Sequence, residues 1–105
     1  MYNLICSFVY IVVTRLDPGS NTSNLSNTRN GDLKTFDEAA KQNGKFVLYV
    51  AKCINGYPNI TKNIIIGNNQ STMDPRQNKE YRNGPLTDNS EYAIFIRVFY
   101  NKVMI

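Results

Sequence analysis

The side chains of this 105-residue chain that could carry chemistry are few. It holds two cysteines, Cys6 and Cys53, and no histidine. Histidine is the commonest general base, the commonest metal ligand and the usual partner of a nucleophilic serine or cysteine. Two cysteines without histidine do not build a common structural zinc site, and the eight acidic residues form no paired constellation. We therefore predict no catalytic residue, no metal site and no cofactor in this chain.

The two cysteines allow two interpretations. Both Cys6 and Cys53 lie on or beside predicted strands, so they could form an extracellular disulfide across a sandwich. They could equally be two buried free thiols that behave as small hydrophobic side chains. Sequence does not show whether their Cα atoms lie within bonding reach, so both interpretations stay open.

Four Asn-x-Ser/Thr sequons occur in predicted loops, where a glycosyltransferase could reach them. The candidate acceptors are Asn21, Asn24, Asn59 and Asn69. Asparagine-rich loops also create such triplets by chance. If the chain is secreted, we expect at least one of the four to be glycosylated.

The formal net charge is +4, from twelve basic and eight acidic residues. The basic residues run from Arg15 to Lys102 without a block or stripe of the kind that nucleic-acid-binding proteins show. We therefore expect an ordinary solvated basic surface and no nucleic-acid partner. The alternative is a small basic β-domain that stacks bases on exposed aromatic residues such as Phe95 or Phe99.

The composition favours strands, because Val, Ile, Tyr and Phe are plentiful while Ala is scarce. The apolar run 4–13 is shorter than the roughly 20 residues that cross a bilayer, and it lacks the flanks of a signal peptide. We expect it to be part of a buried strand. The predicted strands cover residues 4–16, 46–51, 64–66 and 92–100, and the predicted polar loops cover residues 17–33, 54–62 and 67–84.

Two local patterns refine this prediction. Thr35 and Glu38 have the spacing of a capping box, so a helix of one or two turns should begin there and end near Asn43-Gly44. In the last strand, the even-numbered residues 92–100 are all apolar or aromatic, whereas the odd-numbered face mixes apolar residues with Arg97. The mixed face is typical of a half-exposed strand. Strands joined by long polar loops predict an all-β antiparallel sandwich with one short helical insert.

The most specific local pattern precedes the last strand. Leu86 stands six residues before Tyr92, which opens the strand. This is the arrangement of a tyrosine corner, in which the ring packs into a sandwich core and its hydroxyl bonds to backbone a few residues upstream. Leu86 would fill the same corner. Both residues are therefore predicted to be structural, and the alternative is a core tyrosine in an unrelated β-protein.

Several segments of the chain resemble those of a known family. Residues 81–86 (YRNGPL) and 92–97 (YAIFIR) resemble the closing strands of fibronectin type III domains in receptor-type tyrosine-protein phosphatases, closest to the membrane-proximal repeats of the mu/kappa subfamily. Other segments agree in order: residues 10–13 look like strand C, 35–40 like an insert, 48–52 like the following strand, and 66–68 like a turn. The resemblance covers a partial domain, residues 8–102, and leaves 1–7 unmatched.

The resemblance implies an incomplete immunoglobulin-like (fibronectin type III) sandwich, since nothing matches the family's first two strands. Such a chain should expose apolar faces and unpaired edges and should have low stability by itself. The resemblance further implies a non-catalytic spacer and interaction module on the extracellular side of the plasma membrane. Its partners would be other ectodomains or cell-surface proteins, and the membrane would be reached only through the parent protein. Similar repeats occur in receptor kinases and adhesion receptors, which remain alternatives for the parent.

Overall fold

The structure, a computed structural model, describes residues 2–16, 28–41, 48–56 and 63–104. Its strands are β1 (Tyr2–Leu16), β2 (Leu48–Asn55), β3 (Ser71–Asp74), β4 (Lys79–Arg82) and β5 (Glu91–Met104). Two short helices separate β1 from β2: a 3₁₀ turn, η2 (Asn30–Asp32), and α1 (Phe36–Ala40). Every strand pairing is antiparallel. The prediction of an all-β antiparallel fold with a short helical insert is confirmed, and the fold is sandwich-like but incomplete.

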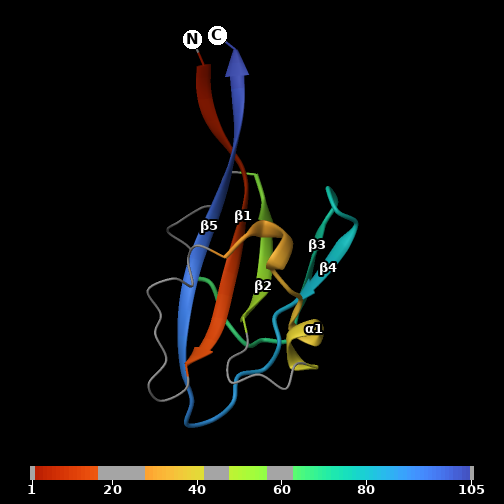
Figure 1. The fold of residues 1–105 in the computed structure, drawn as a ribbon, viewed down its shortest axis with the longest axis vertical. Coiled ribbons are helices and arrows are strands. Elements are labelled where there is room, and N and C mark those ends of the chain that lie inside the picture. Colours follow the sequence, from red (N-terminus) through yellow and green to blue (C-terminus); the bar gives the residue numbers. More distant parts are fainter. Residues whose placement is uncertain (1, 17–27, 42–47, 57–62, 105) are drawn as a thin grey trace.

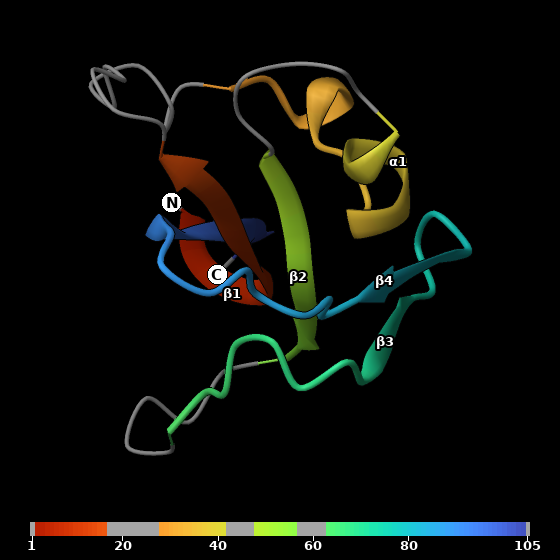
Figure 2. The same ribbon diagram turned by 90° about the horizontal axis from the view of Figure 1, so that it is seen from below.

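The strands form two sheets, a three-stranded one in the order β2-β1-β5 and the two-stranded hairpin β3-β4. β1 is the central strand, and β5 pairs with it along nearly its whole length, with Ile11 opposite Ile96. Figure 1 shows the ends of β1 and β5 projecting together beyond the rest of the molecule, with both termini at that end. Figure 2 shows the β3-β4 hairpin lying on the β2 side of the main sheet.

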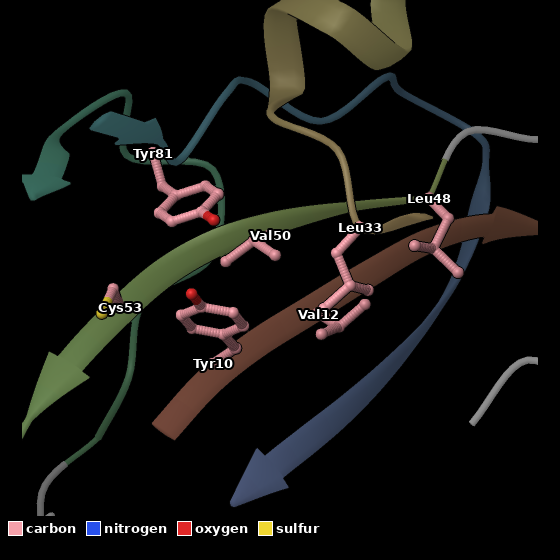
Figure 3. Packing of buried hydrophobic residues seen from close by; sticks show 7 residues of the cluster. All are labelled: Tyr10, Val12, Leu33, Leu48, Val50, Cys53 and Tyr81. Atoms are coloured by element: carbon pink, nitrogen blue, oxygen red, sulfur yellow. The ribbon is translucent and has the colours of Figure 1, made fainter. Parts of the chain in front are cut away.

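The core lies on both faces of β1, because its alternate side chains point to opposite sides. On one face, Tyr10 and Val12 pack with residues of β2, with Leu33 and with Tyr81 of the hairpin (Figure 3). On the other face, Val13 packs with β2 and with Ala39 of α1. β1 is therefore covered on both sides, and its residues from Val9 to Thr14 are all buried.

The predicted capping box at the start of α1 is confirmed. The Glu38 backbone N–H donates to Thr35 Oγ1 at 3.1 Å, and the Thr35 N–H donates to Glu38 Oε1 at 3.0 Å. These two bonds satisfy donors that the helix itself leaves open. The backbone bond from Thr35, followed by Lys79, lowers the pKa of Glu38. The cap holds Ala39 and Phe36 against Tyr49 of β2.

Two predictions about the middle of the chain are wrong. Residues 64–66 form no strand; instead the Ile65 carbonyl accepts a 2.7 Å bond from the buried side chain of Asn83. Residues 67–84, predicted as a loop, contain the β3-β4 hairpin. Its strands are mostly polar and only Asp74 and Tyr81 are buried on them. A strand held by so few core contacts shows no apolar alternation in its sequence.

Candidate functional site

A buried polar network joins the hairpin to the central strand. Asp74, at the end of β3, is fully buried and accepts a short hydrogen bond from the Tyr10 hydroxyl. Arg76, in the hairpin turn, pairs with Asp74 at 3.1 Å through Nε, and its guanidinium lies 3.3 Å from the centroid of the Phe8 ring. The same guanidinium donates to Cys53 Sγ at 3.4 Å. Asp74 thus accepts from the Tyr10 hydroxyl and from the Arg76 backbone N–H at 3.0 Å and lies beside the Arg76 guanidinium, the kind of partners that a buried carboxyl group needs.

The Cys53 thiol and the Tyr10 hydroxyl of this network both favour their neutral forms. Burial, reinforced by Asp74, raises the pKa of the Cys53 thiol above its ordinary value, although Arg76 opposes the shift. A nucleophilic cysteine needs the reverse, a lowered pKa. Burial and the Asp74 hydrogen bond also raise the pKa of Tyr10. Both groups are therefore neutral at physiological pH, and the network holds the hairpin on the sheet.

The structure has Cys53 as a free, buried cysteine. The backbone of Cys6 lies in β1 opposite Tyr100 of β5, and its side chain lies outside the described residues. The disulfide of the first interpretation is therefore not formed at Cys53. Of the two interpretations, the structure agrees with a buried thiol at Cys53, which also touches Arg76.

The hydrogen bond expected of a tyrosine corner is present before β5. The Thr87 backbone N–H donates to the Tyr92 hydroxyl at 2.8 Å, and the Tyr92 ring packs against the cluster around Val13 and Tyr49. Leu86 is less buried than expected, at 40% exposure. It packs on Gly67, whose positive φ of 90° suits glycine and where an added Cβ would lie 3.1 Å from Leu86 Cγ.

The segment that leads into the corner is fixed by two residues that the sequence analysis gave no role. Asn83 Oδ1 accepts from the Gly67 N–H at 2.7 Å, so the one buried amide binds residues on both sides of the 65–67 turn. Gly84 lies under the Phe36 ring, where an added Cβ would be 2.3 Å from Cδ2. Both residues belong to the YRNGPL segment. The three-dimensional structure shows why position 84 needs a glycine and why position 83 needs an amide that can both donate and accept.

The apolar face of β5 is open to solvent. Its even-numbered residues from 94 to 100 are 53%, 63%, 38% and 57% exposed, in the order Ile94, Ile96, Val98 and Tyr100. The odd-numbered residues are half-buried instead. The face that includes Arg97 is half-exposed as predicted, and it is more covered than the wholly apolar face. We call these four residues together with Tyr92 the β5 stripe.

The two aromatic residues that a nucleic-acid interface would need are on the covered face. Phe95 and Phe99 both pack against the core cluster around Tyr10. Phe99 stacks on Phe8 with ring centroids 4.2 Å apart. One face of the Phe99 ring is therefore covered by Phe8, and both Phe95 and Phe99 are half-buried.

The two outer edges of the main sheet also differ. The Val50 N–H on the outer edge of β2 donates to the Lys34 carbonyl at 2.8 Å, and the Cys53 N–H donates to Thr72 Oγ1 at 2.9 Å. No described strand pairs with the outer edge of β5.

Of the four sequon asparagines, the structure describes Asn69. It is exposed in the turn before β3 with a φ of 64°, and its Oδ1 accepts from Arg82 at 2.6 Å. Asn21, Asn24 and Asn59 lie outside the described residues. The position of Asn69 on an exposed turn is sterically suited to a glycan.

Nowhere in the described ranges do three or more Cys, Asp or Glu side chains gather into a potential metal site. Neither of the described helices has the length and hydropathy to cross a membrane. Comparison with known proteins adds no relative: no family model, no curated protein and no solved structure matches the chain.

Proposed function

We propose that this chain is a non-catalytic extracellular module of a cell-surface receptor, similar to the fibronectin type III repeats of receptor-type tyrosine-protein phosphatases. It acts as a spacer and protein-interaction domain between adhesive domains and the membrane. Phosphotyrosine chemistry belongs to another part of the parent protein. The chain lacks histidine, which the phosphatase signature requires, and its described cysteine is buried with a raised pKa.

The observation that carries the proposal is the 2.8 Å bond between the Thr87 N–H and the Tyr92 hydroxyl. A tyrosine at the start of a strand that bonds backbone a few residues upstream is a recurring corner of immunoglobulin-like sandwiches. The bond spans five residues and closes the turn from the hairpin into β5.

The strand order supports the same proposal. The resemblance assigns strand C to residues 10–13, which lie in β1, and the closing strand to the start of β5. In immunoglobulin-like sandwiches strand C lies beside strand F, and in domains that have a strand C′ it follows C in the same sheet. The order β2-β1-β5 matches C′-C-F.

The exposed β5 stripe fits an incomplete sandwich. Inner-face residues of a sandwich alternate along a strand and are covered by the opposing sheet. The β5 stripe alternates in this way and starts at the half-buried Tyr92, yet Ile96 is 63% exposed. An opposing sheet of the complete domain would cover it.

The experiment that tests the proposal is sequencing of the full transcript that encodes these residues. We expect a downstream run of about 20 apolar residues, long enough to span a bilayer, followed by a phosphatase domain. A receptor kinase or an adhesion protein in that place would keep the ectodomain role and change the parent. A transcript that encodes neither a membrane span nor a secretion signal would overturn the proposal.

A further inference from the structure

Asparagine directly precedes glycine at four places in this chain, residues 30–31, 43–44, 55–56 and 83–84. Glycine has no Cβ, so its backbone nitrogen can approach the preceding side-chain amide more closely than that of any other residue. Attack of this nitrogen on the amide carbon releases ammonia and converts the asparagine into an acidic residue. The pair 43–44 lies outside the described residues. For the other three pairs, the surroundings decide which can react.

Two of the three described pairs are protected by the fold. Asn83 is 3% exposed, and its side-chain amide makes two hydrogen bonds of 2.7 Å. In the next pair the attacking group is engaged, because the Gly56 N–H donates to the Ser7 carbonyl at 2.9 Å. The side chain of Asn55 also donates to the Met73 carbonyl at 3.3 Å. Either asparagine would react only after a local opening that breaks these bonds.

The pair Asn30-Gly31 is open in each of these respects. Both residues are exposed in η2, a turn that buries none of its residues. The Gly31 N–H donates to no group in the described part of the chain. A Cβ added at Gly31 would meet no heavy atom within 4 Å. The attacking nitrogen therefore has space around it and no competing acceptor among the described residues.

Arg97 of β5 makes the Asn30 side chain more reactive. Its Nη1 donates to Asn30 Oδ1 at 3.0 Å. This bond withdraws electron density from the amide carbon, and it strengthens as the oxygen becomes negative during the attack. The same contact suits the product, because a carboxylate accepts from a guanidinium more strongly than an amide oxygen does.

We propose that Asn30 is a site of spontaneous deamidation, promoted by Arg97, and that its product forms an ion pair with the same arginine. The Gly31 nitrogen loses its proton to solvent and forms a bond to Asn30 Cγ. The Cγ–Nδ2 bond then breaks, ammonia leaves with a proton from water, and a cyclic succinimide remains. Water opens this ring at either carbonyl and gives aspartate or isoaspartate. The formal net charge falls by one from +4, and the neutral acceptor that joins η2 to β5 becomes a charged one.

The first test follows every Asn-Gly pair of the whole chain by mass spectrometry during incubation in mildly alkaline buffer. Trypsin cuts after Lys and Arg, so it places the four pairs on four different peptides. Asn30 should react at least about 10-fold faster than Asn55 or Asn83, because breaking two hydrogen bonds reduces the opened population by about that factor. In urea, where the chain is unfolded, the three rates should become similar.

The second test removes the guanidinium. Arg97→Met should slow the reaction of Asn30 about 5-fold, the value of one charge-assisted hydrogen bond at an exposed site. Lys52→Met is the matched control, because it removes a positive charge from another half-buried strand position, on β2. The control should leave the rate unchanged, and circular dichroism should show both variants folded like the original chain.

A third measurement examines the product contact without the reaction. The new carboxyl group in Asn30→Asp should have a pKa lower by about 0.5 than in the double variant Asn30→Asp/Arg97→Met, the size of effect that an exposed ion pair gives. Asp32 lies in the same turn. Its charge is present in both variants, so the comparison isolates the contribution of Arg97. Nuclear magnetic resonance titration measures both values.

The proposal is overturned if Asn30 reacts no faster than Asn83 in the folded chain, or if Arg97→Met leaves the rate of Asn30 unchanged or raises it. Equal pKa values in the single and the double variant would overturn it too, because the product would then not pair with Arg97. The inference depends on the contacts of Asn30 alone, and it stands or fails independently of the receptor role.

Discussion

The two outer strands of the main sheet, β2 and β5, have opposite surroundings. Both pair antiparallel with β1, and each carries aromatic and β-branched side chains. In β2 the residues from Leu48 to Ala51 are all buried, and its outer edge is bonded to Lys34 and Thr72. In β5 the stripe is exposed and no described strand pairs with the outer edge.

The difference shows that β-propensity and apolar alternation identify a strand without fixing what covers it. The residues that cover β2 come from α1, from the β3-β4 hairpin and from residues 33–34. None of these segments adjoins β2 in the sequence, and the hairpin is mostly polar. On β5, Tyr92 packs against the cluster around Val13, and Phe95 and Phe99 pack against the cluster around Tyr10.

The largest expected effect is alkaline destabilisation through buried tyrosines. Burial, followed by the proximity of Tyr92, raises the pKa of Tyr49 on β2 to about 12 from 10.0. Because tyrosine is neutral when protonated, stability is intact below pH 10 and is lost as the pH rises toward 12. Tyr49 alone should account for roughly 3 kcal/mol of the free energy of unfolding. Urea titrations across this range measure the loss.

Two phenylalanine variants sharpen this prediction. The Tyr49 hydroxyl is buried without a hydrogen-bond partner among the described residues. Tyr49→Phe should therefore raise the free energy of unfolding at neutral pH by about 1 kcal/mol and reduce the alkaline loss. Tyr100→Phe, on the exposed stripe, should change neither. An alkaline loss that persists unchanged in Tyr49→Phe would show that another group controls it, with Tyr10 the next candidate because its pKa is also raised.

The second effect is the loss of core volume from each strand. Val50→Ala on β2 removes two methyl groups from a fully buried site, which should cost about 2–3 kcal/mol including the cavity. Val98→Ala removes the same groups from a site that is 38% exposed and should cost less than about 0.5 kcal/mol. Urea titrations at neutral pH compare the two at dilute concentration. Equal losses would mean that the face of β5 is covered after all.

Much of this architecture could be predicted from local signals. The long first strand, the capped helix and the last strand each carry a pattern that a few neighbouring residues determine: a β-branched run, a Thr35–Glu38 pair, a strict alternation. The tyrosine-corner bond was predicted from the six-residue spacing of Leu86 and Tyr92 at the start of the last strand. Local patterns are sufficient where the partner is backbone within a few residues.

The failures have a common physical cause. Residues 64–66 have the composition of a strand, but the Ile65 carbonyl accepts a hydrogen bond from the side chain of Asn83, 18 residues later in the sequence. The β3-β4 hairpin is mostly polar, and several of its contacts with the main sheet are polar too. Asp74 bonds Tyr10, which is 64 residues away in the sequence, and Arg76 contacts Cys53 and Phe8. Alternation on β5 correctly indicated a half-exposed face at the odd-numbered residues, but it did not show that the apolar face is open, because burial depends on which elements surround the sheet.

The third effect concerns the closed edge of β2. Thr72→Val should remove the acceptor of the Cys53 N–H while keeping the side-chain volume, and the donor is left buried. The expected loss is about 1–2 kcal/mol. Thr72→Ser keeps the hydroxyl and should retain most of the stability. The hydrogen-exchange rate of the Cys53 amide measures how well the outer edge of β2 is protected. A rate that Thr72→Val leaves unchanged would show that the bond to Thr72 does not protect this amide.

The smallest effect is expected where β5 is tied to the rest of the molecule. Tyr92→Phe keeps the ring against Val13 and Tyr49 and removes only the hydroxyl that accepts from the Thr87 N–H. Thr87 is exposed, so water can replace the lost acceptor, and the cost should be about 0.5–1 kcal/mol in a urea titration. The Thr87 amide should exchange faster while amides in the middle of β1 keep their protection. If Tyr92→Phe instead unfolded the whole chain, the corner would be as important to stability as the β2 core, and the contrast between the two outer strands would hold only beyond residue 92.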